Sequence, residues 1–247
     1  MKGKKTRSPK PVRRLRSVSN VALIVMLAAL CAITMGGGAM YSVFTSTDSN
    51  VHYSGRTGES EVALMINVYG GGEYVDGILE VLESRGATAT FFLGGCWADD
   101  NNDRVNAIVS AGHEIGNHGY FHKDHSKLDY NGNKSEITTL NALIKTVCGK
   151  EIKLFAPPSG AYGKTAVQVC KELDMQLIMW SKDTIDWRDK DEDLVYSRAC
   201  KDIKAGDMIL MHPTAHTLKA LPRILDAYEQ AGLHTVSVST IIGMPII

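Results

Sequence analysis

Short apolar runs rich in β-branched and aromatic residues alternate with longer amphipathic stretches from residue 61 to the end of the chain. The run 62–68 (VALMINV) predicts a buried strand. The stretch 74–86 has apolar residues at helical spacing and stops at Gly86, which predicts a helix. Strands that alternate with helices of this length predict parallel β-α units, hence an open doubly wound sheet or a barrel.

The same patterns place the other elements. Further strands are predicted over residues 87–95, 113–117, 153–158, 175–180, 207–213 and 234–239. Further helices are predicted over residues 103–112, 135–150, 164–174, 194–206 and 218–232. The helix 135–150 is expected to begin with Ser135 as its N-cap and to end at Gly149.

A different pattern precedes these elements. Residues 1–17 contain eight Lys and Arg residues and no acid, and residues 21–44 contain no charge. This apolar segment is long enough to span a bilayer as a helix, with its basic flank cytoplasmic and the rest of the chain outside. A cleaved signal peptide is the alternative, because the apolar core is short and Gly37 and Ala39 suit a cleavage site.

These features divide the chain into four parts. We expect a basic cytoplasmic head at 1–17, a transmembrane anchor or signal segment at 18–44, a polar linker at 45–60 and a folded domain at 61–247. Both readings of the apolar segment place the domain outside the cytoplasm, as a single-pass membrane protein or as a secreted one.

Charge is unevenly distributed along the chain. The sequence has 27 basic and 27 acidic residues, and because the head holds eight of the bases, the remainder has 19 bases against 27 acids. An acidic domain argues against nucleic-acid binding, which needs a basic surface. No glycine-rich dinucleotide or P-loop motif follows any predicted strand.

Cysteine usage leaves the redox state open. Cys31 lies in the apolar segment, and Cys96, Cys148, Cys170 and Cys200 show no CxxC spacing. Outside the cytoplasm these four could form two disulfides in any of three pairings. Buried thiols are equally consistent with a domain of this size.

Several polar residues follow directly after predicted strands. They are Asn67, His118, His122, Asp183, Asp186, Trp187 and His212. The carboxyl ends of parallel strands meet at one end of a barrel, so these side chains are expected to converge there. His118 and His122, four residues apart on one helical turn, could bind one metal ion. His113 is expected to begin a strand and His125 to cap a loop rather than to bind metal.

Five segments carry a family resemblance. NHGYFHKDHSKL is similar to a metal-binding motif NHTxxHxxL, LFAPPSG to an arginine-proline motif, DTIDW to an aspartate-tryptophan motif and GDMILMH to a terminal histidine motif. ALMINVYGGGEY lies where ALTFDDGP is expected. In order and spacing, the chain from Val62 to about Val238 resembles the polysaccharide deacetylase domain (NodB homology, carbohydrate esterase family 4).

The resemblance implies a distorted (β/α) barrel, typically with seven strands. It also implies a hydrolase that removes acetyl groups from N-acetylated sugars in peptidoglycan or chitin-like glycans. A divalent metal, usually zinc, assists an Asp general base and a His general acid in that family. The implied partner is cell-wall polysaccharide, and the apolar N-terminal segment makes the membrane a second expected partner.

The resemblance also assigns roles to individual residues. His118 and His122 match the metal ligands. His212 matches the general acid, and Asp186 matches the carboxylate that orients it. Trp187 matches a wall of the sugar groove, and Pro157 belongs to the arginine-proline motif and is implied in substrate binding.

Three positions depart from the family pattern, and all bear on catalysis. Asn67 stands where the catalytic-base Asp is expected, and a carboxamide has no basic site near neutral pH. Val68 replaces a metal-binding Asp, which leaves two protein ligands where catalytic zinc usually has three. Ala156 replaces the Arg that pairs with the base, and without the carboxylate that Arg would be an uncompensated buried charge.

The departures are similar to those of a divergent branch of the family in Gram-positive sporulating bacteria, and they leave three readings. The first is an active enzyme with a rebuilt site in which Asp183 or Glu73 supplies the carboxylate. The second is a degenerate deacetylase that still binds glycan. In the third, the remaining polar residues are structural remnants. The intact histidines and Asp186 favour the first two, because buried polar groups need partners.

Overall fold

A computed structural model describes residues 49–244. Within this range nine strands form one sheet. Their bounds are β1 Val51–His52, β2 Glu61–Val68, β3 Ala89–Leu93, β4 Glu114–Asn117, β5 Leu154–Phe155, β6 Gln176–Ile178, β7 Lys182–Asp183, β8 Met208–Met211 and β9 His234–Thr235. Their order is β1-β6-β5-β4-β3-β2-β8-β7, with β9 on β2, and every pairing is parallel.

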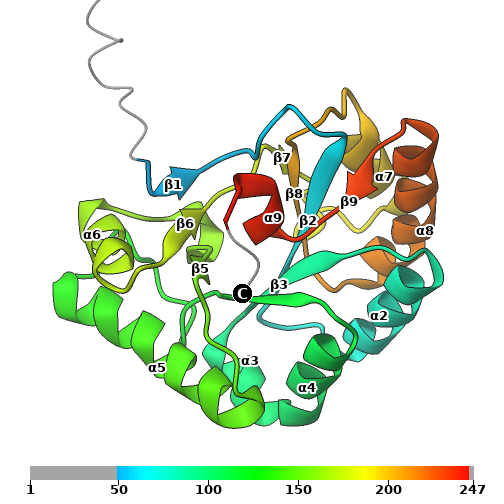
Figure 1. The fold of residues 1–247 in the computed structure, drawn as a ribbon. Coiled ribbons are helices and arrows are strands. Elements are labelled where there is room, and N and C mark those ends of the chain that lie inside the picture. The colour runs from blue at the N-terminus through cyan, green and yellow to red at the C-terminus, as the bar shows by residue number, and fades with distance from the viewer. Residues whose placement is uncertain (1–48, 245–247) are drawn as a thin grey trace, which may run out of the picture. The chain divides into compact units, whose positions relative to one another are not determined.

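Helices connect these strands and surround the curled sheet (Figure 1). The longer ones are α2 Val75–Ser84, α4 Asn102–Ser110, α5 Tyr130–Cys148, α6 Lys164–Glu172, α7 Glu192–Cys200 and α8 Ala215–Gln230. The shorter ones are η1 Gly72–Tyr74, α3 Gly95–Asp100, η2 Pro158–Gly160 and α9 Val238–Ile242. The result is a curled parallel half-barrel, which confirms the predicted barrel-type α/β fold.

Strand β2 lies near the middle of the sheet between β3 and β8. Its side chains alternate between the two faces, as a strand requires. Val62, Leu64 and Ile66 belong to the large core between sheet and helices. Ala63 and Met65 belong to a smaller core inside the curl, where Val238 and Ile241 of α9 cover them. Burial on both faces explains why this strand is apolar without interruption.

Local chemistry moves several predicted boundaries. Helix α5 begins at Tyr130, because the Asp129 side chain accepts a hydrogen bond from the Gly132 amide and caps the helix. The prediction of Ser135 as N-cap was therefore wrong, whereas Gly149 ends the helix with a φ of 73° as predicted. The strand predicted over 234–239 is two residues long, because Ser237 caps α9.

The N-terminal predictions fall mostly outside the described residues. The apolar segment 18–44 lies there, as do Cys31 and the basic head. Among residues 49–244, no helix has the length and apolar character needed to cross a bilayer. Part of the predicted linker is structured, since β1 pairs with β6. Cys96, Cys148, Cys170 and Cys200 are all free thiols.

A fragment of residues 46–247 should fold by itself. Both cores that the structure describes are formed by residues of this range, and a domain with its own hydrophobic core can fold alone. Circular dichroism of the fragment should show one cooperative thermal transition. A gradual, non-cooperative loss of ellipticity would contradict this domain boundary.

Candidate active site

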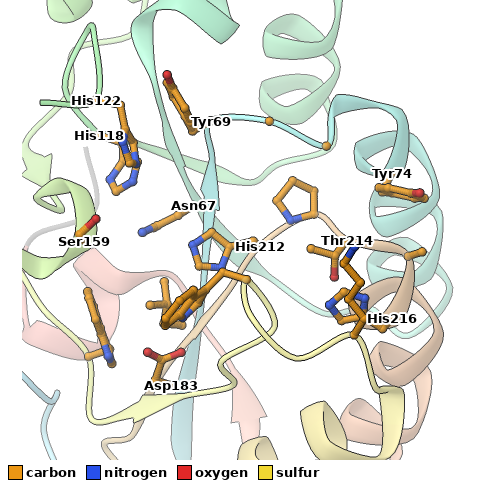
Figure 2. Close-up of a pocket in the computed structure, with 18 residues that line it drawn as sticks. Asn67, Tyr69, Tyr74, His118, His122, Ser159, Asp183, His212, Thr214 and His216 are labelled. Atoms are coloured by element: carbon orange, nitrogen blue, oxygen red, sulfur yellow. The ribbon is translucent and has the colours of Figure 1, made fainter.

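A cavity of about 770 Å³ opens at the carboxyl ends of the strands (Figure 2). Its wall is made of Asn67, Tyr69, Gly70, Gly71, Tyr74, His118, His122, Ser159, Trp180, Asp183, Trp187, Lys190, Leu210, His212, Pro213, Thr214, Ala215 and His216. The loops after β2 and β8 approach closely here: a Cβ on Gly71, whose φ is 69°, would lie 2.0 Å from the Pro213 carbonyl oxygen. The predicted convergence of polar residues at this end of the sheet is therefore observed for the residues in this wall.

His118 follows directly after β4 and is almost fully buried. Its Nδ1–H donates a hydrogen bond of 2.7 Å to the Ala156 carbonyl oxygen. This bond fixes the tautomer and leaves the Nε2 lone pair free, which is the arrangement of metal-binding histidines. Burial, reinforced by the neighbouring His122, lowers the pKa of His118 to about 3, so the ring is neutral at physiological pH.

His122 lies beside His118, but not on a helix. The two ring centroids are 5.0 Å apart. His122 has a φ of 54° and Gly119 a φ of 73°, so the segment after β4 is a loop and the prediction of one helical turn was wrong. Burial lowers the pKa of His122 as well.

Tyr69 is a site residue that sequence reasoning missed. Its ring stacks on His122 with centroids 4.1 Å apart and an interplanar angle of 26°. The ring is half exposed and also lines the cavity. Tyr69 occupies the position of the glycine in the ALTFDDGP motif. This departure is visible in the sequence, but the stacking on His122 is not.

His212, which is partly exposed, forms an acid-base pair with the buried Asp186. The His212 Nδ1–H donates to Asp186 Oδ1 at 2.7 Å, and the His212 amide and the Thr217 hydroxyl both donate to Oδ2 at 2.6 Å. Burial raises the pKa of Asp186, but hydrogen bonds and attraction from His212, with that of Thr217, outweigh it and hold the pKa below its usual value. Asp186 is therefore an ionised carboxylate that orients His212.

Asn67 ends the series of β2 side chains that face the inside of the curl. It is 3% exposed, and its Oδ1 has no hydrogen-bond partner among the described residues. The neighbouring departures do not reach the cavity. Val68 belongs to the large core and Ala156 to the small one.

The other predicted site residues divide into two groups. Asp183 and Trp187 line the cavity, and the Trp187 side chain is 60% exposed. Glu73 is exposed on η1 and Pro157 is buried, and neither belongs to the lining. Trp180 and Ser159, the serine of LFAPPSG, also line it, although neither was predicted as a site residue.

The arrangement offers a histidine oriented by a carboxylate and two adjacent imidazoles. No group of three His, Cys, Asp or Glu side chains in residues 49–244 could hold a metal ion. The free Nε2 of His118 and the ring of His122 beside it nevertheless fit a site with two imidazole ligands. The site could therefore bind a metal only through a reduced ligand set.

The sequence model of polysaccharide deacetylases matches residues 54–178. The chain therefore belongs to the polysaccharide deacetylase family, a family of hydrolases, which confirms the resemblance seen in the motifs. It is 37% identical over 180 residues to the uncharacterized protein YlxY of Bacillus subtilis, covering 73% of this chain and 56% of that protein. It is 28% identical over 190 residues to a peptidoglycan-N-acetylglucosamine deacetylase of Bacillus cereus, covering 75% of this chain and 69% of that protein.

Comparison of the fold with solved structures identifies members of the same family. A CE4 family pseudoenzyme from Bacillus anthracis superimposes with a TM-score of 0.76 at 32% identity, covering 80% of this chain and 70% of that one. A mutant of that pseudoenzyme, described as having restored enzymatic activity, has a TM-score of 0.76 at 30% identity, with 80% and 72% covered. Structural neighbours thus include both an inactive member and its reactivated form.

Burial of neutral His118 should make the folded state sensitive to acid. Its pKa is about 3 when folded and 6.5 as a free side chain, so the unfolded chain binds more protons between these values. The contribution of His118 to the free energy of unfolding is therefore fully present above pH 6.5 and is lost as the pH falls toward 3. At about pH 5 this group alone should lower the unfolding free energy by about 2 kcal/mol.

Urea unfolding at about pH 7.5 and about pH 5 measures this loss. In His118→Asn, whose carboxamide can still donate to Ala156, the loss should be smaller by about 1–2 kcal/mol. His234→Asn, at an exposed position, is the matched control and should behave like the wild type. Equal losses in all three proteins would show that His118 is not the acid-sensitive group.

Proposed function

We propose that this protein is a catalytically impaired polysaccharide deacetylase that binds N-acetylated cell-wall glycan in the cavity at the carboxyl ends of its strands. The observation that carries the proposal is Asn67, whose carboxamide occupies the position of the general base. A carboxamide can orient a water molecule but cannot accept its proton. Hydrolysis of the acetyl amide therefore lacks its first proton transfer.

The rest of the cavity supports ligand binding. Trp187 and Tyr69 present exposed ring faces in its wall, and aromatic faces combine large contact area with little conformational freedom. The volume of about 770 Å³ is in the range of small-ligand sites and admits a sugar ring with its substituents. Asp186 orients His212 through a hydrogen bond, so the group that we propose as the general acid is held in position.

A divalent metal, zinc by family analogy, is the cofactor that His118 and His122 would hold. A bound metal would polarise the carbonyl of an acetamido group. The residues themselves supply two imidazoles, a weaker set than three strong protein ligands. In a turnover, His212 would donate its proton to the departing amine while Asp186 stabilises the imidazolium.

An active enzyme is the second candidate, and Asp183 favours it. This carboxylate lines the same cavity as His212, and its Oδ1 accepts a hydrogen bond of 2.7 Å from the Ile185 amide. A carboxylate in this wall could act as base for a water molecule in place of Asn67. Glu73, the other carboxylate considered for this role, is exposed and absent from the wall.

We also propose that the domain acts outside the cytoplasmic membrane. The basic residues 1–17 followed by the uncharged residues 21–44 support this location. A peptidoglycan ligand agrees with it, since the relatives include peptidoglycan deacetylases. Accessibility of the domain to protease added to intact cells tests the location, and full protection would contradict it.

Zinc content should depend on the two histidines. Removing either His118 or His122 leaves a single imidazole, so His118→Ala and His122→Ala should each lose at least about tenfold in zinc affinity. Competition with a chromophoric chelator gives the affinity, and His234→Ala is the control at a histidine outside the cavity. Unchanged zinc stoichiometry in the double variant would place the metal elsewhere.

Deacetylation should be gained by restoring the family residues together. The triple change Asn67→Asp, Val68→Asp, Ala156→Arg returns base, ligand and guanidinium, and we expect acetate release from N-acetylglucosamine oligomers to rise by about 10²- to 10⁴-fold. Ala156→Arg alone should gain nothing, because it adds an unpaired buried charge. If the wild type is already fast and Asn67→Asp slows it, the second candidate is correct and Asp183→Asn should abolish turnover.

A further inference from the structure

The cavity has a second end, away from the two histidines that would hold a metal. Figure 2 shows Tyr74, Thr214 and His216 on the side of His212 that is remote from His118. All of these residues belong to the cavity wall. A ligand that fills the cavity therefore meets a second set of polar groups, separate from the acid-base pair and from the adjacent imidazoles.

Three loops meet to form this second end. A Cβ on Gly71 would lie 2.0 Å from the Pro213 carbonyl oxygen, so the loop after β2, which leads to Tyr74, contacts the loop after β8. The His216 Nε2–H donates a hydrogen bond of 2.6 Å to the backbone oxygen of Asp186, which holds the loop after β7 against the first turn of α8. Because these contacts involve backbone atoms, the second end is formed before any ligand arrives.

Lys190 supplies a positive charge at this end. It is exposed in the loop that His216 holds, and it belongs to the cavity wall. The other cations near this loop are neutralised, since Arg188 and Arg198 both pair with Asp189, at 2.9 and 2.6 Å. Within residues 49–244 the ammonium of Lys190 has neither a hydrogen bond nor an ion pair. Its charge is therefore available to a ligand.

The groups around Lys190 suit an anion. The Tyr74 hydroxyl, partly buried, has no hydrogen-bond partner in the described part of the chain and can donate to an oxygen. Asp183 is the carboxylate of the described wall, and Figure 2 shows it on another side of His212 from Tyr74. Asp191, next to Lys190 in sequence, already accepts two amide hydrogen bonds as the N-cap of α7. An unpaired ammonium and an unused hydroxyl favour a negatively charged oxygen group.

We propose, resting on the proposed glycan-binding function, that Lys190 and Tyr74 bind a carboxylate on the O3 side chain of a muramic acid unit. N-acetylglucosamine alone is neutral and offers this end of the cavity no anion. Muramic acid bears an O3 substituent that ends in a carboxylate or continues into a peptide with carboxylates of its own. The cavity then prefers peptidoglycan strands to chitin-like glycan, and the preference depends on charge rather than on the acetyl group.

Calorimetry with three oligosaccharides tests this preference. They are the N-acetylglucosamine tetramer, the peptide-free tetrasaccharide of alternating N-acetylglucosamine and N-acetylmuramic acid, and the same tetrasaccharide carrying its peptides. At about pH 7.5 and about 20 mM salt, the full-length protein should bind a muramic acid ligand about fivefold more tightly than the neutral tetramer. Raising the salt to about 0.5 M should weaken this preference, because salt screens an exposed charge.

Four variants assign the preference to this end of the cavity. Lys190→Gln should reduce the affinity ratio to at most about two, whereas Lys190→Arg should retain most of it because the charge remains. Tyr74→Phe should about halve the ratio by removing one donor. Lys150→Gln removes a charge from an exposed lysine outside the cavity and should leave the ratio unchanged. All four should show the cooperative melt of the wild type.

The peptide-free and the peptide-bearing ligands identify the source of the carboxylate. A Lys190-dependent preference for the peptide-free ligand assigns it to the ether side chain itself, and one for the peptide-bearing ligand assigns it to the peptide. Either result supports the inference.

Other outcomes separate this inference from the proposed function. Equal affinity of the wild type for all three ligands, or an unchanged ratio in Lys190→Gln, would overturn the inference and leave glycan binding intact. An equal fall in Lys150→Gln would show a general charge effect and would also overturn it. No binding of any of the three ligands would refute the proposed function itself.

Discussion

Strand β2 is buried on both faces, and the alternation of its side chains decides where the chemistry of this protein lies. Val62, Leu64 and Ile66 face the helices, so Ala63 and Met65 face the inside of the curl. Asn67 continues the second series and emerges in the cavity. A shift of one residue in the register with β3 and β8 would exchange the faces and place Val68 there instead.

The changes in the site are consistent with one another electrostatically. The Asp to Asn change at position 67 removes the charge that a buried Arg at position 156 would need, and Ala156 there packs into the small core. The Ala156 backbone still has a role, because its carbonyl oxygen orients His118. On the opposite side of the cavity His212 retains its ionised partner Asp186. Under the proposed function, position 67 therefore cannot accept a proton, whereas the His212–Asp186 pair can still orient a ligand.

The sequence predicted the sheet, most helices and the meeting of polar residues at one end, because these follow from apolar periodicity and from the geometry of parallel strands. Short-range capping and left-handed backbone did not follow from periodicity. Asp129 rather than Ser135 caps α5, and the φ values of Gly119 and His122 turn an apparent helical HxxxH into a loop. Tyr69 and Trp180 line the cavity because segments distant in the sequence meet there. Pro157 is buried and does not line it, which the motif alone did not indicate.

The central claim is that the cavity binds N-acetylated glycan without hydrolysing it. Incubating the wild-type protein with N-acetylated peptidoglycan and excess zinc, then measuring bound protein and released acetate in the same sample, tests it most directly. The account predicts saturable binding, with acetate release no more than about one per cent of that by the triple variant Asn67→Asp, Val68→Asp, Ala156→Arg. Acetate release by the wild type at the rate of that variant, or no binding at all, would contradict it.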